Sequence, residues 1–189
     1  MDNRKDTLTR IVFAAVMAAM VYVVTIFRVP FLGSKIHFAN AVCLLSGIFL
    51  GPVTGGLAAG IGSGLYDMIG GYGIIEALIT FVSKFAMAWV CAKLIGREDK
   101  QPHPLARLEL SCIAGQLTYV ALYMLKTFIF QKFVYAYPME TVTATMISKL
   151  IPSLINALAS VIVAPIFYYA VRPALNSSGI LAKLRRSAS

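Results

Sequence analysis

Five ionisable residues lie within or close to long apolar runs of the chain, and they are the first candidates for chemistry. They are two acids and three lysines: Asp67, Glu76, Lys84, Lys126 and Lys149. A charge inside a bilayer costs several kcal/mol, so it normally faces a cavity or an opposite charge. If all five are ionised, one positive charge is left over. That excess favours a ligand with a carboxylate, a phosphate or several hydrogen-bond acceptors.

Polar residues recur at helical spacing around these charges. Residues three or four positions apart share one face of a helix, and three polar stripes follow: Glu76, Thr80, Ser83, Lys84 and Met87; Gln116, Tyr119, Tyr123 and Lys126; and Thr145, Lys149, Ser153 and Asn156. Three successive helices that each turn a polar stripe inward predict a pocket, in which Tyr119 and Tyr123 could stack on a flat ring. The alternative is a structural network in which Glu76 pairs with Lys84 or Lys126.

The sequence lacks the usual motifs of enzymes and metal sites. The segment from Gly51 to Gly56 is followed by Leu57, so there is no P-loop, and the chain is expected to bind no ATP itself. No HExxH or GxSxG sequence occurs, and His37 and His103 stand alone. The three cysteines lie in apolar stretches without metal-ligand spacing: Cys43, Cys91 and Cys112. We therefore expect a non-catalytic protein without a metal or cofactor.

The composition predicts a membrane protein. Of 189 residues, 59% are hydrophobic and 13% are charged, against roughly 25% charged in an average soluble domain. With about 20 residues per crossing, this length accommodates six spans and no separate soluble domain. The net charge of +9 does not indicate nucleic-acid binding, because the basic residues lie between the apolar runs and act as topology signals.

Proline, glycine and polar segments divide the apolar sequence into six predicted spans. The uncharged run from 36 to 66 is too long for one ordinary span, and Gly51-Pro52 breaks it because proline disfavours helix in the residue before it. The predicted spans are 9–28, 37–50, 53–69, 74–95, 106–132 and 140–171, and a basic cytoplasmic tail follows at 172–189. The expected fold class is an all-α integral membrane protein, a single bundle of six transmembrane helices.

The distribution of Lys and Arg predicts the orientation, because positive charge accumulates on the cytoplasmic side of a membrane. With six spans and the N-terminus inside, the outer loops hold only Arg28, Lys35 and Lys132. The inner segments hold eleven basic residues: Arg4, Lys5, Arg10, Lys93, Arg97, Lys100, Arg107, Arg172, Lys183, Arg185 and Arg186. Both termini are therefore expected in the cytoplasm, and the pocket is expected to open to the outside.

Small residues repeat at intervals of four in the first and third predicted spans. They form an alanine face and a glycine face: Ala14, Ala15, Ala18 and Ala19; and Gly56, Gly60 and Gly64. Such faces allow helices to approach closely in lipid. We favour internal packing for the glycine face. For the alanine face, spacing alone leaves open whether it packs internally or meets another protein.

With these features in place, the sequence resembles a known family, the substrate-binding S components of energy-coupling factor (ECF) vitamin transporters. The matching features are the length, the six spans, the alanine face and the segment KIHFANAVCLLSGIFLGPVTGGLAAGIGSGLYDMIGG from Lys35 to Gly71. The core of that segment, Leu45 to Asp67, is similar to the group that contains the riboflavin-type and the pyrimidine- or pyridoxine-type S components. The resemblance covers nearly the whole chain.

The resemblance implies a substrate class and a site. S components of this kind bind a vitamin or related micronutrient in an outward-facing pocket formed by the last three spans and by the loops after spans one, three and five. Those loops correspond here to Arg28–Phe38, Gly70–Gly73 and Lys132–Pro138. Together with the polar stripes, they give the expected substrate-binding residues: Lys35, Asp67, Tyr72, Glu76, Lys84, Tyr119, Tyr123, Lys126, Lys149 and Asn156.

The resemblance also implies a location and protein partners. It places the chain in the bacterial cell membrane, where the alanine face is similar to the surface that contacts a membrane T component. The T component couples in turn to two cytoplasmic ATPases, which use the ATP. The lack of a P-loop in this chain agrees with that division of roles.

The sequence is also compatible with two other functions. The first is a stand-alone secondary transporter driven by ions, with Asp67 or Glu76 as the proton or sodium site. Such transporters commonly contain inverted repeats, and the two halves of this chain show no convincing similarity. The second is a membrane enzyme or assembly factor. No motif in the sequence singles out one vitamin.

Overall fold

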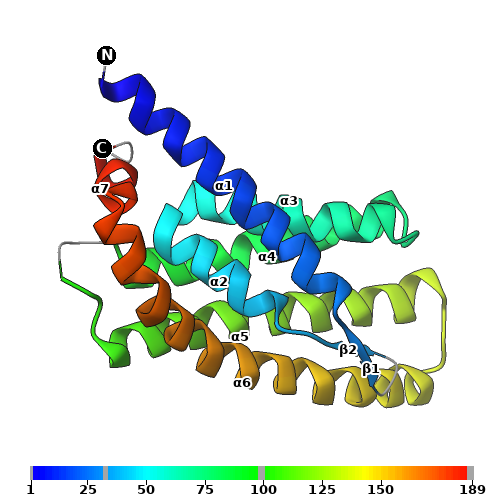
Figure 1. Cartoon of the computed structure of the whole chain (residues 1–189). Helices are drawn as coiled ribbons and strands as arrows, with labels where there is room; N and C mark the ends of the chain where they lie inside the picture. Colours follow the sequence, from blue (N-terminus) through cyan, green and yellow to red (C-terminus); the bar gives the residue numbers. More distant parts are fainter. Residues whose placement is uncertain (1, 32–33, 98–100, 187–189) are drawn as a thin grey trace.

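Seven α-helices and one small hairpin make up the described part of the chain (Figure 1). This computed structural model describes residues 2–31, 34–97 and 101–186, and for residues 2, 3, 34 and 35 it describes the backbone alone. The helices are α1 (Asp2–Ile26), α2 (Ala39–Leu50), α3 (Pro52–Ile69), α4 (Ile74–Ile95), α5 (Leu105–Ile129), α6 (Met139–Ser177) and α7 (Ile180–Arg186). A π-helical turn, Phe130–Val134, continues α5.

The core is built around α2, which is buried at every one of its 12 residues. Its sequence is nearly all apolar, as expected for a helix that is enclosed on every side. Helices α1, α3, α4 and α6 pack around it. At about 1.5 Å per residue, α2 is about 18 Å long, shorter than a hydrocarbon core of about 30 Å. The segment predicted as a span at 37–50 thus forms a short helix enclosed by the other helices, and its count as a crossing stays a prediction.

Four helical segments in the described part are long and apolar enough to cross a bilayer: Arg4–Ile26, Ile74–Ile95, Leu105–Val134 and Met139–Ser177. Large apolar side chains on these helices face outward, as Leu117 (60% exposed) and Leu158 (66% exposed) illustrate, and a lipid-facing surface has this character. The chain is therefore a multi-pass membrane protein with a helical body, as its composition predicts. Because α2 and α3 are not among the four segments, the number of six crossings stays a prediction.

The ends of the chain differ from the sequence-based expectation. α1 begins at Asp2, well before residue 9, and α6 continues to Ser177. After a turn at Ser178 and Gly179, α7 makes the predicted tail helical again from Ile180 to Arg186. In α7, Leu181 and Leu184 are buried in the core, which gives this short helix an apolar face to pack. The Nε atom of Arg186 lies 2.9 Å from Oδ2 of Asp6. Both termini therefore lie together at one end of the bundle (Figure 1).

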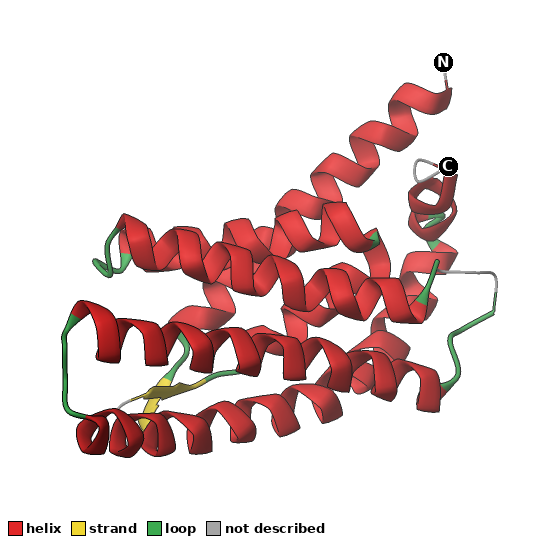
Figure 2. Ribbon diagram, turned by 180° about the vertical axis from the view of Figure 1, so that it is seen from behind, coloured by secondary structure: helices red, strands yellow, loops and turns green. Residues whose placement is uncertain are grey.

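A hairpin occupies part of the loop predicted after the first span. Strands β1 (Val29–Phe31) and β2 (Ser34–Ile36) pair antiparallel, with Val29 opposite Ile36. Strand β2 packs against α6, and Figure 2 shows the strand pair next to the helices at the end away from the termini. Three-residue strands are too short to give a period-two pattern in the sequence, so the sequence analysis contains no hairpin here.

Glycines allow close approach between several helices. A Cβ on Gly55 would lie 2.3 Å from the carbonyl oxygen of Ser46, and a Cβ on Gly56 or Gly60 would meet the rings of Phe85 and Phe81 on α4 at 2.8 Å. The glycine face of the third predicted span thus packs internally against α4, as expected from its small residues.

Candidate functional site

A polar cavity of about 320 Å³ lies toward the end of the bundle away from the termini, between α3, α4, α5 and α6. Nine of the ten residues predicted to bind substrate line it: Asp67, Tyr72, Glu76, Lys84, Tyr119, Tyr123, Lys126, Lys149 and Asn156. The tenth, Lys35, lies in β2, and its side chain falls outside the described part. The volume reaches the lower end of the range of small-molecule sites, about 300–1,000 Å³.

The deep wall of the cavity contains a buried lysine that is bonded to one amide, which is bonded in turn to a second. Lys84 is 3% exposed, and its Nζ donates a hydrogen bond to Oδ1 of Asn40. The Nδ2 of Asn40 donates in turn to Oε1 of Gln116 at 3.2 Å. No carboxylate of the described residues forms an ion pair with Lys84. Its charge is met by amide dipoles and by the face of Tyr119, whose ring centroid lies 3.6 Å from Nζ.

The side-chain amides of Asn40 and Gln116 form a hydrogen-bonded pair, and one N–H group of Gln116 has no acceptor among the described residues. Among the described residues, the buried Nε2 of Gln116 has no hydrogen-bond acceptor. Asn40 and Gln116 are each 1% exposed, so neither amide is freely hydrated. An unmet donor in such a place is costly, which makes it unusual in a purely structural core. The arrangement fixes Asn40 as a rigid support for the ammonium group of Lys84.

Nearer the opening, two lysines have different surroundings. Nζ of Lys126 lies 2.6 Å from Oε2 of Glu76, with the two side chains 18% and 32% exposed. Lys149 makes no hydrogen bond or ion pair within the described part, and neither does the carboxylate of Asp67. The cavity therefore contains one closed ion pair, and Lys149 and Asp67 stand open to a ligand. Glu76 pairs with Lys126 and not with Lys84, so part of the structural network exists within the wall of the cavity.

Lys126 and Lys149 are expected to respond differently to replacement by Met. Lys126→Met leaves the carboxylate of Glu76 without its ion pair, so we expect it to lower the free energy of unfolding by about 1–3 kcal/mol. Lys149→Met removes a half-buried charge that has no hydrogen-bond or ion-pair partner among the described residues, so the stability without ligand should stay equal or rise. Thermal melting of the two purified variants checks this difference. Equal melting temperatures for both would contradict the assigned pairing.

Residues from the first half of the chain close the cavity. The backbone N–H of His37 donates to Oδ1 of Asn156 at 3.0 Å, which ties the segment after β2 to α6. Nη1 of Arg28 donates to the hydroxyl of Tyr72 at 2.8 Å, and the guanidinium carbon lies 5.2 Å from the ring centroid of Tyr66. The loop after α1 and the turn after α3 thus meet at the cavity, as the family resemblance implies for these loops.

The predicted aromatic pair is present, and a lysine lies over each ring. The rings of Tyr119 and Tyr123 are stacked, with centroids 6.1 Å apart and planes at 14°. Because Lys84 also covers a face of Tyr119, that ring acts mainly as a support for the lysine. The Nζ of Lys126 lies 6.0 Å from the ring centroid of Tyr123, farther than Lys84 lies from Tyr119, so Tyr123 is the better candidate for stacking on a flat ligand.

The alanine face lines a second, apolar groove between α1 and α3. Ala15 and Ala19 are exposed, whereas Ala14 and Ala18 are half-buried and pack on the core. The face therefore takes part in internal packing and also presents small residues outward. Its small side chains leave room for another helix to approach closely.

Of the two histidines, His37 lines the polar cavity and His103 does not. The backbone N–H of His103 donates to the hydroxyl of Tyr168, and the backbone N–H of His37 is bound as described above. Cys43, Cys91 and Cys112 are buried free thiols. No group of three or more possible metal ligands occurs among the described residues.

Comparisons with known proteins place the chain in a family. The model of a family described as ECF-type riboflavin transporter, S component, matches residues 5–173. Among solved structures, the chain is similar to an S component of a bacterial ECF transporter, with a TM-score of 0.67 and 16% sequence identity over 89% of this chain and 98% of that chain. A search of curated proteins gave no match. Because the family model covers α1 to most of α6, the chain belongs to the family of ECF-type riboflavin transporter S components.

Proposed function

We propose that this chain captures riboflavin or a closely related flat heteroaromatic vitamin in the polar cavity. The observation that carries the proposal is Lys84, a buried ammonium group without a carboxylate partner in the described part, at the cavity wall. Such a donor favours a ligand edge with several acceptors, and the carbonyl groups of a flavin ring form such an edge. Tyr123 offers a stacking face, and the name of the family points to riboflavin.

The proposed site is tested by titrating riboflavin into the purified chain and following the quenching of flavin fluorescence. We expect saturable binding that weakens in Lys149→Met. The matched control is Lys183→Met, because Lys183 lies in α7 at the other end of the bundle. Equal affinities in the wild type and in both variants would overturn the assignment of the cavity. Absence of flavin binding in the wild type would direct the search to other heteroaromatic vitamins.

We further propose six crossings with both termini in the cytoplasm. Two observations support this topology. The ion pair between Asp6 and Arg186 holds the two termini at one end, as an even number of crossings requires. Asn40 at the start of α2 contacts Lys84 at the cavity, and Leu50 at its end contacts Arg10 near the termini. Helix α3 starts there at Pro52 and returns to the cavity at Asp67, so α2 and α3 run in opposite directions between the two ends. The cavity then opens to the outside of the bacterial cell membrane.

The proposed importer includes a membrane T component and two cytoplasmic ATPases. The support is the family assignment together with the exposed part of the alanine face. Co-expression with a T component and its ATPases, followed by affinity purification of this chain, separates this function from an ion-driven transporter. A complex that imports vitamin only with ATP is the expected result. Uptake by the isolated chain in liposomes with an ion gradient would support the alternative.

Ala15→Trp and Ala19→Trp are expected to block transport without affecting vitamin binding. Both alanines are exposed, so the larger side chain obstructs the approach of another helix rather than the packing of α1. Ala14 and Ala18 are less suitable, because they contact the core. Uptake assays and flavin titrations on the same variants check this prediction. Ala121→Trp, at an exposed alanine of α5, is the control, and equal loss of uptake in all three variants would contradict a specific interface.

A further inference from the structure

Asp67 brings a carboxylate to the wall of the polar cavity that no described side chain neutralises directly. The residue lies in α3, two positions before the last residue, Ile69, and it is half-buried. Its carboxylate forms no hydrogen bond or ion pair with a described residue. A carboxylate that is partly removed from water without a donor is costly, so a ligand that brings a donor to this place is favoured.

The other strong acceptors of the cavity wall already have donors. Oε2 of Glu76 lies 2.6 Å from Nζ of Lys126. Oδ1 of Asn156 accepts the backbone N–H of His37 at 3.0 Å. Within the described lining, Asp67 is therefore the acceptor that is most open to an N–H group of a ligand.

Asp67 shares its part of the cavity with the buried Lys84. The carboxylate interacts electrostatically with Lys84 and with the hydroxyl of Tyr119, and Nζ of Lys84 lies 3.6 Å from the ring centroid of Tyr119. Asp67 and Lys84 form no direct ion pair, although both line the same space. The cavity thus offers a ligand one charged donor and one charged acceptor in the same region.

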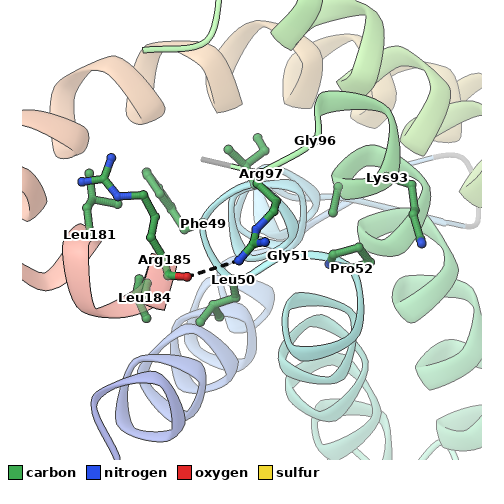
Figure 3. A pocket seen from close by; sticks show the side chains of 12 residues that line it. Phe49, Leu50, Gly51, Pro52, Lys93, Gly96, Arg97, Leu181, Leu184 and Arg185 are labelled. Atoms are coloured by element: carbon green, nitrogen blue, oxygen red, sulfur yellow. Dashed lines mark hydrogen bonds between the residues drawn. The ribbon is translucent and has the colours of Figure 1, made fainter. Parts of the chain in front are cut away.

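The cavity at the end of the bundle that holds the termini lacks this combination. It has a volume of about 220 Å³, and Figure 3 shows its basic side chains Lys93, Arg97 and Arg185 pointing in different directions. Its lining, as far as the structure describes it, contains no carboxylate. The donor and the acceptor that face one space are thus a feature of the polar cavity.

An ammonium group near a carboxylate matches a ligand edge that has an acceptor next to an N–H donor. Lys84 can only donate and an ionised Asp67 can only accept, and hydrogen bonds with one charged partner are the stronger kind. The imide edge of a flavin ring has this arrangement, because its N3–H group lies between the carbonyl groups C2=O and C4=O. A ligand edge with acceptors alone would match Lys84 and leave the carboxylate of Asp67 without a donor.

We propose that Asp67 accepts the N3–H group of the flavin ring while Lys84 donates to a carbonyl group beside it. This contact rests on the proposed function and narrows the ligand to rings in which an N–H group adjoins a carbonyl group. Asp67 is then a specificity residue, because an analogue with a blocked N–H group leaves the carboxylate unpaired in the complex. The imide edge of the ring is bound between α3 and α4.

The test compares riboflavin with 3-methylriboflavin, in which a methyl group replaces the N3 hydrogen and both carbonyl groups are kept. Each flavin is titrated into the full-length wild type, Asp67→Ala, Asp67→Asn and Lys149→Met by the quenching of flavin fluorescence. Asp67→Asn keeps the size of the side chain and removes its charge. Lys149→Met is the control within the same cavity, because Lys149 interacts electrostatically with Lys126 and Glu76. Melting temperatures without ligand show that the variants are folded.

The ratio of the two affinities is the quantity that decides. We expect the wild type to bind 3-methylriboflavin at least about tenfold more weakly than riboflavin, as the loss of a hydrogen bond to a charged group predicts. In Asp67→Ala the two affinities should lie within about threefold of each other, and Asp67→Asn should give an intermediate ratio. Lys149→Met should weaken the binding of both flavins and keep the ratio of the wild type.

Three results would contradict the contact. Equal affinities of the wild type for both flavins, or an unchanged ratio in Asp67→Ala, would overturn the role of Asp67 and leave the proposed function in place. A full penalty in Asp67→Asn with none in Asp67→Ala would show that the side chain only crowds the methyl group, which also overturns this role. Absence of flavin binding by the wild type would overturn both the contact and the binding of flavin.

Discussion

Lys84→Met is expected to weaken riboflavin binding by about 10- to 100-fold, the loss that follows from removing a hydrogen bond to a charged group. The ammonium group forms no direct ion pair with a described carboxylate and lies at the cavity wall, so we expect it to donate to an acceptor atom of the ligand. The fold should survive, because the change removes a buried charge and leaves only the amide oxygen of Asn40 without its donor. A flavin titration and a melting curve on the same sample measure both effects, with Lys183→Met as the control.

Asn40→Asp tests the contact between Lys84 and Asn40 by changing the acceptor instead of the lysine. The substitution places a carboxylate against Lys84, whose Nζ already bonds to Oδ1 of Asn40. The charge of Lys84 is then met inside the protein. Rotation of the Gln116 amide lets its unused Nε2 donate to the second carboxylate oxygen, which replaces Nδ2 of Asn40, so the melting temperature without ligand should stay the same or rise while the affinity for riboflavin falls. If Lys84→Met and Asn40→Asp both lower the melting temperature and leave the affinity of the folded fraction unchanged, Lys84 has a structural role and the assignment of the cavity is wrong.

Gly55→Val is expected to have the largest effect on the fold. A Cβ on Gly55 would lie 2.3 Å from the carbonyl oxygen of Ser46 and 2.6 Å from the Cα of Gly47, so backbone atoms of α2 and α3 must separate. Overpacking of this kind costs about 3 kcal/mol, which corresponds to a drop of roughly 6–12 °C in melting temperature for a chain of this size.

The comparison variants for Gly55 separate overpacking from a change of helix propensity. Ala121→Val introduces the same side chain at an exposed position of α5, where no neighbour has to move, and should change the melting temperature little. Gly55→Ala should be destabilising by less than Gly55→Val. A melting temperature for Gly55→Val within 2 °C of the wild type, a limit set by the size scaling of unfolding entropy, would show that α2 and α3 can separate at little cost.

The membrane class and the polar cavity could be predicted because their signals are local. Asp67, Glu76, Lys84, Lys126 and Lys149 are conspicuous in apolar runs, and the spacing of three and four residues assigns them to helix faces. A charged side chain inside a bilayer normally faces a cavity or an opposite charge, because burial in lipid is costly. For this reason the polar helix faces converge on one cavity. The pairing of Glu76 with Lys126, by contrast, depends on the distance between α4 and α5, and the sequence left two partners open.

The support of Lys84 could not be derived from the sequence. Asn40 lies more than forty residues before Lys84 and stands at the start of α2. The sequence indicated this contact only by an amide in an otherwise apolar segment, and an isolated asparagine does not show which residue it bonds to. Gln116 was placed on a polar stripe, yet it contacts Asn40 behind the cavity rather than a ligand within it.

The structure after residue 172 shows a second limit of prediction from the sequence. A basic composition suggested a tail, but Leu181 and Leu184 at a spacing of three give α7 an apolar face that packs on the core. With only seven residues, α7 is too short for its pattern to predict a helix, and its stability comes from contacts with α1 and α6. Tertiary contacts of this kind are not visible in a local pattern.

The most direct test of the proposed function is to identify the small molecule that this chain retains. The wild type and Lys84→Met are purified gently and in parallel from cells grown in the same medium with riboflavin. Both proteins are then denatured, and the released molecules are identified and quantified by mass spectrometry. We predict that the wild type releases riboflavin or another flat heteroaromatic vitamin and that Lys84→Met releases much less of it. Release of no such molecule by the wild type, or of equal amounts by both proteins, would contradict vitamin binding at this cavity.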